Sequence, residues 1–306
     1  MAIRIWEKEN RFQDRRTRKA LAAILRLHHQ GKGKSGRNAP ELENEKWPGG
    51  QEWIRCQDVF ERRLWEWLEP PVFSLKQATQ ADAACMLMLA NVILADWIAS
   101  GSFFFDTNED TPEQEIRERA CDFLRQAGMV PMAFPRVHSF CTLWPQIPEA
   151  QKRPLQNALD CFFAETETEE LPQMMILEAP MGEGKTEAGI YAAFRLMEYW
   201  KKNGFYIALP TSATANQMEI RMNRFLKMHG ERNAKLLHSS AWLFESEFQL
   251  EEDDVHTEEE LWLSSSKRGL LAPAAVGTVD QVMMAAMRVK YAVLRLGGLA
   301  GKGVLI

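Results

Sequence analysis

Apolar residues recur at helical spacing through the N-terminal part of the chain. Most of these stretches carry charged residues on their other faces, but the third is apolar nearly all round. Pro70-Pro71 and Gly128 follow two of the stretches and are typical helix terminators. The pattern predicts a helical domain over residues 1–128. Its predicted helices are Ile5 to Leu27, Trp53 to Leu68, Thr79 to Ser100 and Pro112 to Gln126.

The pattern changes after Pro172, where short apolar runs alternate with helical stretches. Runs of strand length separated by helices predict a parallel sheet with crossover helices. The fold class predicted for the whole chain is therefore α + α/β, with the parallel-sheet lobe over residues 173–306. The predicted strands are Met174 to Leu177, Phe205 to Leu209, Lys235 to Leu237, Ala275 to Val276 and Gly303 to Ile306, and the predicted helices are Thr186 to Lys201 and Ala213 to His229.

Residues 129–172 separate these two regions and contain six prolines. Because proline interrupts both helices and strands, this density predicts a connecting region rather than packed elements. Residues 245–260 form a strongly acidic stretch inside the second region, and we expect a solvated insertion there.

The sequence Ala179-Pro-Met-Gly-Glu-Gly-Lys-Thr186 lies between a predicted strand and a predicted helix, as a phosphate-binding loop requires. Its glycines let backbone N–H groups turn toward phosphate oxygens, and the helix N-terminus adds a partial positive charge. Lys185 is expected to reach the β- and γ-phosphates, and the Thr186 hydroxyl to ligate Mg²⁺. The alternative is a plain glycine turn with a solvated lysine. The predicted ATP-binding residues of the loop are Ala179, Gly182, Glu183, Gly184, Lys185 and Thr186.

Composition narrows the range of functions. The net charge is −5, from 37 basic and 42 acidic residues, so any nucleic-acid contact must come from a local patch. Five cysteines are scattered singly, which argues against a zinc site or a disulfide framework and predicts a cytoplasmic location. The uncharged run Ala83 to Ala95 is shorter than the ~20 residues of a membrane span, so no membrane partner is expected.

Three ordered motifs, Leu177 to Glu187, Leu209 to Met218 and Gly277 to Gln281, resemble those of superfamily-two helicases. Over residues 150–306 the chain is most similar to the CRISPR-associated helicase–nucleases of type I interference systems. This resemblance implies a RecA-like lobe of an ATP- and Mg²⁺-dependent helicase that moves along single-stranded DNA in CRISPR antiviral defence. It also implies a partner, the CRISPR RNA-guided surveillance complex.

The same resemblance implies contacts with the DNA backbone through helix N-termini and hydroxyl groups, which are independent of base sequence. The implied nucleic-acid-binding residues are Thr211, Thr214, Gln217 and Thr278. Alternatively, these threonines only cap helices, each cap being worth about 1 kcal/mol. Arg153-Pro-Leu-Gln156 resembles the upstream motif whose glutamine reads adenine, which would add Gln156 to the ATP site. Otherwise Gln156 is a surface residue.

The family also carries an N-terminal histidine–aspartate (HD) nuclease domain. Ile24 to Gly31 resembles its paired-histidine motif, and Asn91 to Ile98 resembles the helix with its last aspartate ligand. The resemblance implies that His28, His29 and Asp96 bind a divalent transition metal, which lowers the pKa of bound water. In the alternative, the histidines lie at a wet helix end and the aspartate meets an N–H or arginine partner.

The chain departs from the family pattern at both ends. No histidine precedes His28 and no His-Asp dipeptide occurs, so the family's first metal ligands are missing. Leu299 to Ile306 resembles the strand before the D-E-x-H motif, whose acids bind Mg²⁺ and orient the attacking water, but that motif does not occur. We therefore expect a partial nuclease domain, the N-terminal part of a helicase lobe and no catalysis by this chain alone.

Two other functions stay open. The chain could be a non-catalytic ATP- or DNA-binding module that works with a separately encoded helicase lobe. It could also be an unrelated loop-containing NTPase, such as a small-molecule kinase, in which Thr211, Gln217 and Thr278 have no role.

Overall fold

The computed structural model divides the chain into two compact units, Met1–Trp97 and Ile98–Ile306, and each is described by itself. The residues that it describes are 55–56, 59, 62, 78–104, 107, 111–132, 136–166, 171–230, 234–237, 262–263, 268–287 and 291–306.

Helix α4 (Ala78–Ala99) makes up most of the described part of the first unit, and it confirms the helix predicted from Thr79 to Ser100. Leu89, Ala90 and Ile93 are its buried residues and lie on one side of the helix. The helix predicted from Ile5 to Leu27 lies outside the described residues, as does most of the one from Trp53 to Leu68.

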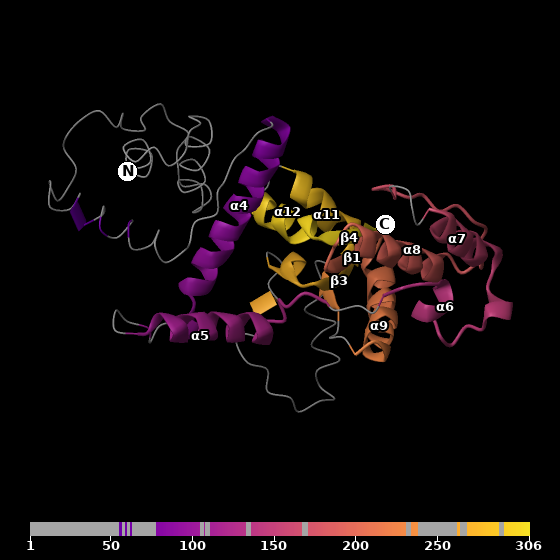
Figure 1. The fold of residues 1–306 in the computed structure, drawn as a ribbon, viewed down its shortest axis with the longest axis horizontal. Coiled ribbons are helices and arrows are strands. Elements are labelled where there is room, and N and C mark those ends of the chain that lie inside the picture. The colour runs from indigo at the N-terminus through magenta and orange to yellow at the C-terminus, as the bar shows by residue number, and fades with distance from the viewer. Residues whose placement is uncertain are drawn as a thin grey trace. The chain divides into compact units, whose positions relative to one another are not determined.

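The second unit contains a parallel sheet with strand order β2-β3-β1-β4, of which Figure 1 labels β1, β3 and β4. This sheet confirms the predicted α/β lobe. The strands are β1 (Gly204–Leu209), β2 (Lys235–Leu237), β3 (Ala274–Thr278) and β4 (Lys302–Leu305). The longer helices are α5 (Glu113–Gln126), α7 (Pro154–Glu165), α8 (Lys185–Tyr199), α9 (Ser212–Met228), α11 (Val279–Ala286) and α12 (Ala292–Ala300). Short helical turns are η1 (Ser102–Phe104), α6 (Phe140–Leu143), η2 (Glu149–Gln151) and η5 (Gly269–Leu271).

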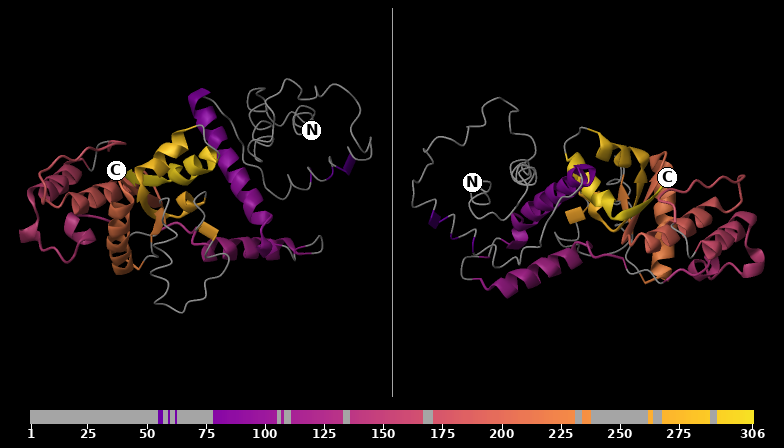
Figure 2. Two further views of the ribbon diagram at one scale, coloured as in Figure 1. Left: turned by 180° about the vertical axis from the view of Figure 1, so that it is seen from behind. Right: turned by 45° about the horizontal axis from the view of Figure 1, so that its top comes forward.

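Helices cover both faces of this sheet, and Figure 2 shows the layers from two further sides. Phe205 and Ile207 of β1 point into a core shared with α8 and α9, whereas Tyr206 and Ala208 pack with residues of η5, α11 and α12. The alternation follows from the two-residue repeat of a strand. It explains why β1 is apolar at nearly every position, as strands buried on both faces are.

The predicted connecting region contributes two helices to the core of this unit. Phe140 of α6 and Phe163 of α7 each make an edge-on ring contact with Tyr191 of α8, with ring centroids 5.7 and 5.6 Å apart. The prolines here begin elements, since Pro148 precedes η2 and Pro154 is the first residue of α7. A first-turn proline loses no hydrogen bond, so proline density did not indicate missing structure.

The strand predicted from Met174 to Leu177 is wrong. Residues 173–179 have no strand assignment, although alternate side chains are exposed and half-buried along them. Met175 and Leu177 pack against the core, so the apolar pattern reports real burial. A strand also needs a hydrogen-bonded neighbour, and no backbone hydrogen bond joins these residues to another described residue.

The acidic stretch 245–260 lies outside the described residues. Among the helices that are described, none combines the length and apolar character that crossing a membrane requires.

Candidate nucleotide site

The loop between Ala179 and Thr186 has a backbone that requires its glycines. Gly182 and Gly184 have φ angles of 83° and 67°, in the left-handed region that only glycine adopts easily. Helix α8 begins directly after Gly184, so its first N–H groups lack partners within the helix. The turn and helix N-terminus together form the concave, N–H-lined surface that binds anions.

The packing of α8 on β4 places this loop at the carboxyl edge of the sheet. A Cβ added to Gly189 would lie 3.3 Å from the Leu305 side chain, and one added to Gly303 would lie 2.6 Å from that of Met197. The helix therefore runs antiparallel to β4, with its first turn beyond the end of the strand. Ligands of open α/β sheets bind at this edge.

Lys185 spans the loop. Its Nζ donates a hydrogen bond of 2.6 Å to the Ala179 carbonyl oxygen, so the ammonium group lies across the turn that contains the glycines. Lys185 is exposed and Thr186 is half-buried at the start of α8. Both residues therefore lie at the end of the turn, where α8 begins.

Gln156 lies against this loop, although the remainder of α7 and the residues after it separate the two in the sequence. Only 3% of Gln156 is exposed, so the alternative of a surface glutamine is wrong. A Cβ added to Gly184 would lie 2.5 Å from the Gln156 amide nitrogen. The Gln156 Oε1 accepts a 3.0 Å hydrogen bond from the backbone N–H of Arg153, which fixes the direction of the amide.

Sequence reasoning missed a second side chain at this position. The Arg153 Cδ lies 3.5 Å from the position of a Cβ on Gly184, and Arg153 is exposed. Its cation therefore starts beside the loop and can reach an anion bound there. The signal was present in the tetrapeptide Arg153-Pro-Leu-Gln156, because the residue before a helix and the third residue after it share one side.

An ion pair holds the helix that carries Gln156. Lys152 Nζ lies 2.7 Å from Asp160 Oδ2, and the Phe140 N–H donates to Asp160 Oδ1 at 2.8 Å. Burial alone raises the pKa of the Asp160 carboxyl, but its hydrogen bonds, first that from Lys152, and the positive charge of Lys152 together outweigh burial and lower it. The pair thus ties the residues before α7 and the start of α6 to the middle of α7.

The residues after β1 form a helix cap at the same edge of the sheet. The Thr211 Oγ1 accepts from the Thr214 N–H at 3.3 Å, and the Thr214 hydroxyl donates to the Thr211 carbonyl at 2.8 Å. Thr211, Thr214 and Gln217 are all exposed, three residues apart on α9. These threonines therefore do cap α9, while their exposed positions leave room for a phosphate.

Thr278 lies beside that cap, because β1 and β3 are parallel and Leu209 is in register with Thr278. Only 7% of Thr278 is exposed, and its side chain does not cap α11. Its carbonyl oxygen accepts a 2.9 Å hydrogen bond from the Tyr206 hydroxyl. The structure thus brings Thr278 to the expected edge but covers most of its side chain.

The residues expected to bind a metal are only partly described. Asp96 is half-buried in α4, and it has an interaction partner. His28 and His29 lie outside the described residues. Within the part of the chain that the structure does describe, no three histidine, cysteine or acidic side chains gather as a metal site.

Comparison with known proteins identifies the relatives of both units. The family model described as Cas3, HD domain, matches residues 1–105. A CRISPR-associated endonuclease/helicase Cas3 from Thermus thermophilus is 31% identical over 94% of this chain and 32% of its own length. The crystal structure of T. fusca Cas3 matches with a TM-score of 0.73 and 29% identity, over 94% of this chain and 33% of that one.

The chain is Cas3-like. The curated Cas3 relatives that it matches are named CRISPR-associated nuclease/helicases, and the chain spans about a third of their length. The Cas3 match confirms the predicted fold class, a helical HD-type region followed by a RecA-like parallel-sheet lobe.

Two further matches concern ligands and partners. T. fusca Cas3-ATP matches with a TM-score of 0.57 and 34% identity, over 72% of this chain and 25% of that one. A chain of a CRISPR RNA-guided surveillance complex, pre-nicking, matches with a TM-score of 0.52 and 26% identity, over 84% of this chain and 25% of that chain. These relatives are an ATP-bound protein and a chain of a surveillance complex.

Proposed function

We propose that the second unit binds ATP with Mg²⁺ at the loop between Ala179 and Thr186. The observation that supports this most is the placement of Gln156 against Gly184. Phosphates bound by the loop would leave the base near this buried amide, whose nitrogen can donate to an acceptor on adenine. Lys185 and the helix N-terminus would bind the phosphates, and the Thr186 hydroxyl would ligate Mg²⁺.

Binding of a fluorescent ATP analogue to the complete 306-residue chain tests this proposal. We expect saturable, Mg²⁺-dependent binding that Lys185→Ala weakens at least about ten-fold, since a charge-assisted hydrogen bond is worth roughly 1.5–3 kcal/mol. Lys201→Ala is the matched control, because Lys201 lies beyond the other end of α8 and should not affect binding. Equal affinities of the wild type and Lys185→Ala would contradict the proposed site.

We further propose that this chain binds ATP without rapid hydrolysis. The loop supplies phosphate and magnesium ligands, but the 306 residues contain no Asp-Glu dipeptide to bind Mg²⁺ and orient water. A steady-state phosphate-release assay should show turnover no faster than that of Lys185→Ala. DNA-stimulated turnover that Lys185→Ala abolishes would refute this, and would favour a complete ATPase over a non-catalytic module.

Single-stranded DNA is the proposed nucleic-acid ligand, contacted by Thr211, Thr214, Gln217 and Thr278. Support comes from the position of these residues at one edge of the sheet, where β1 and β3 end in register. The exposed end of α9 can offer N–H groups and hydroxyls to a phosphate without reading bases. Fluorescence anisotropy of a labelled oligothymidine measures the affinity of the chain for single-stranded DNA, and substitution of Thr211 tests the proposed contact.

The first unit is proposed to bind a divalent transition metal through His28, His29 and Asp96. The HD-domain family match spans all three positions, which favours this function specifically. Two imidazoles and a carboxylate suit such a metal, and a bound metal would activate water for cleavage of DNA. Isothermal titration of the whole chain with Mn²⁺ should show one site that His28→Ala removes, and unchanged binding in that variant would exclude these ligands.

We propose that the biological setting is CRISPR antiviral defence in the cytoplasm, with the RNA-guided surveillance complex as partner. The matches to Cas3 relatives and to a chain of such a complex support this setting. Co-purification of the whole chain with a type I surveillance complex loaded with target DNA tests the partner. Equal recovery from complexes with and without target DNA would argue against recruitment for interference.

A further inference from the structure

The exposed side of α9 carries positive charges beyond its N-terminal cap. Arg221, Arg224 and Lys227, which together form the basic stripe, are all exposed. They follow Thr214 and Gln217 at steps of three or four residues, so all five side chains lie along one side of the helix. At 1.5 Å per residue, this side extends about 20 Å from the cap.

The charges of the basic stripe are poorly balanced by nearby acids. The single acidic residue of α9, Glu219, is half-buried and accepts a hydrogen bond from within the helix. Arg221 pairs with Glu187 of α8. Neither Arg224 nor Lys227 has an ion pair with any other residue that the structure describes. The stripe is therefore locally positive on a chain whose net charge is −5.

Helix α5 shows the different arrangement of an ordinary solvated helix. Each of its arginines, Arg117, Arg119 and Arg125, pairs with an acidic residue three or four positions earlier on the same helix. Such pairs balance charge within a helix. The helix dipole favours a cation such as Lys227 in the last turn of α9, but its effect fades before Arg224. Helix stability alone therefore does not account for the stripe.

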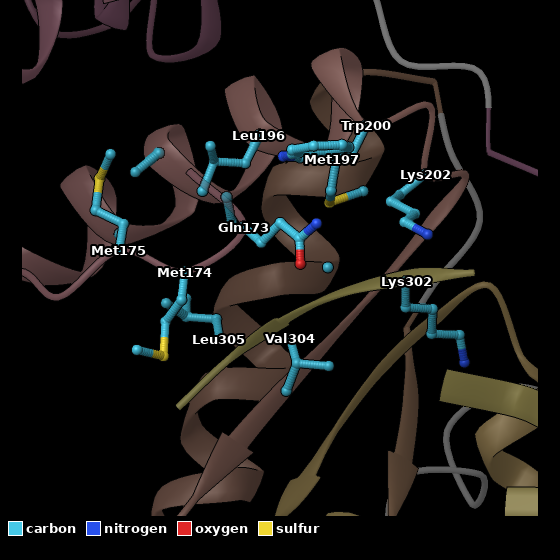
Figure 3. A pocket seen from close by; sticks show the side chains of 14 residues that line it. Gln173, Met174, Met175, Leu196, Met197, Trp200, Lys202, Lys302, Val304 and Leu305 are labelled. Carbon is cyan, nitrogen blue, oxygen red and sulfur yellow. The ribbon is translucent and has the colours of Figure 1, made fainter. Parts of the chain in front are cut away.

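The cavity beside α8 does not offer an anion the same kind of surface. It has a volume of about 480 Å³, and Figure 3 shows apolar side chains such as Leu196 and Met197 around it. Lys202 and Lys302, which also line it, each donate to a backbone carbonyl oxygen. These two charges already have partners within the fold, unlike those at the far end of α9.

We propose that the basic stripe binds the phosphate backbone of single-stranded DNA and continues the path of the strand that contacts the cap of α9. The inference rests on the proposed DNA function and lengthens its contact surface by most of a helix. Exposed cations bind phosphates whatever the bases are, as the hydroxyls and N–H groups of the cap do. One helix then holds successive phosphates of one strand.

The surface chemistry of α9 favours a nucleic acid over a protein partner. The centre of a protein interface is apolar and depleted of charge. The large apolar side chain that α9 exposes is Met228, its last residue, and the positions from Thr214 to Lys227 on the exposed side are polar or basic. A row of cations without an apolar centre fits a polyanion.

The test is the salt dependence of oligothymidine binding to the whole chain, wild type and the double variant Arg224→Gln/Lys227→Gln. For single strands, the logarithm of the affinity falls against that of the salt concentration with a slope of about 0.7 for each phosphate contact. The double variant should lose about 1.4 from this slope. Its affinity should then be about 25-fold weaker at about 0.1 M salt and approach that of the wild type near 1 M.

Two control variants separate contact from general effects of charge or folding. Arg117→Gln/Arg125→Gln removes two exposed charges from α5, a separate helix in Figure 1, and should bind within about two-fold of the wild type. Arg224→Lys/Lys227→Arg exchanges the two cations, keeps the charge and should also bind like the wild type. Equal weakening by the α5 variant would overturn the proposal, because overall charge then explains the loss.

The outcomes distinguish the stripe from the proposed DNA function. If Thr211→Asp weakens binding and Arg224→Gln/Lys227→Gln does not, the stripe is wrong and the cap contact stands. A wild-type chain that binds no oligothymidine overturns both. If the double variant keeps its DNA affinity but is no longer recovered with the surveillance complex, a protein occupies the stripe and the proposal is wrong.

Discussion

At the scale of single residues, Gly184 has two reasons to be glycine. Its φ angle is 67°, and a Cβ there would lie 2.5 Å from the Gln156 amide nitrogen. Gly182 shares only the first reason, because a Cβ there meets no atom within 4 Å. We expect Gly182→Ala to lower stability by about 1 kcal/mol through backbone strain, and Gly184→Ala to lower it further and weaken ATP-analogue binding at least about ten-fold.

The comparison is checked by thermal unfolding and analogue titration of both variants. Gln156→Ala should recover part of the stability lost in Gly184→Ala, because it removes the clashing side chain. If the double variant is as unstable as the sum of the singles, the close approach of Gly184 and Gln156 is not what excludes a side chain.

Gln156 is predicted to set base preference. Its amide is buried beside the loop and oriented by the Arg153 N–H, so it offers a fixed donor to a base. We expect Gln156→Ala to weaken the ATP analogue about ten-fold and GTP competition little, since one oriented hydrogen bond is worth roughly 1.4 kcal/mol. Competition titrations measure this, with Gln217→Ala on α9 as control. Equal weakening of ATP-analogue and GTP binding would show that Gln156 has only a structural role.

At the scale of elements, the cap of α9 separates two possible roles of Thr211. Thr211→Asp keeps an acceptor for the Thr214 N–H and so keeps the cap, but adds a negative charge where a phosphate is proposed to bind. We expect unchanged thermal stability and about ten-fold weaker oligothymidine binding. Thr211→Val removes the acceptor and should cost about 1 kcal/mol of stability. Undiminished DNA binding by Thr211→Asp would leave capping as the residue's whole role.

The Lys152–Asp160 ion pair is predicted to stabilise the packing of α7. Both side chains are largely buried, with 9% and 17% exposed. Lys152→Met leaves the Asp160 carboxylate without its cation, and we expect a loss of about 3 kcal/mol in unfolding free energy. Glu149→Gln, at the exposed end of the same lysine, should change stability little. Chemical denaturation measures both, and a smaller loss for Lys152→Met than for Glu149→Gln would contradict the assignment.

A helix or strand could be predicted from the sequence wherever its apolar residues are buried and its backbone is also hydrogen-bonded. β1 and β3 read as apolar runs because both of their faces are covered, and α9 read as a helix with an N-terminal cap. Residues 174–177 have the same local pattern, but a strand depends on a neighbour that local sequence does not specify. The approach of Gln156 to Gly184 is also tertiary, so only the family motif indicated it.

At the scale of the whole molecule, the lowered pKa of Lys302 should make the stability of the fold depend on pH. Burial lowers the pKa of Lys302 to about 7 from 10.5, and its ammonium group donates to the Leu270 carbonyl. The unfolded chain therefore binds more protons than the folded chain between about pH 7 and pH 10. This lysine should make stability rise with pH across that window. Below it both states are protonated, and the full cost of a buried charge remains.

Lys302→Met tests this sign. We expect the variant to have a higher thermal midpoint than the wild type near neutral pH. The gap in unfolding free energy between the two proteins should narrow as pH rises, by at most about 1.4 kcal/mol for each pH unit. Thermal unfolding of both proteins in buffers across the window measures the gap. A gap that stays constant would mean that Lys302 does not titrate there.

The register of β1 with β3 has a mechanical consequence. The Tyr206 hydroxyl binds the Thr278 carbonyl beneath the edge that carries Thr211, and an ion pair joins Glu187 of α8 to Arg221 of α9. A close-packed layer of this kind resists bending. The loop between Ala179 and Thr186 and the cap of α9 therefore keep a fixed position relative to each other. Under the proposed function, nucleotide binding would therefore move the loop and the cap of α9 together rather than relative to one another.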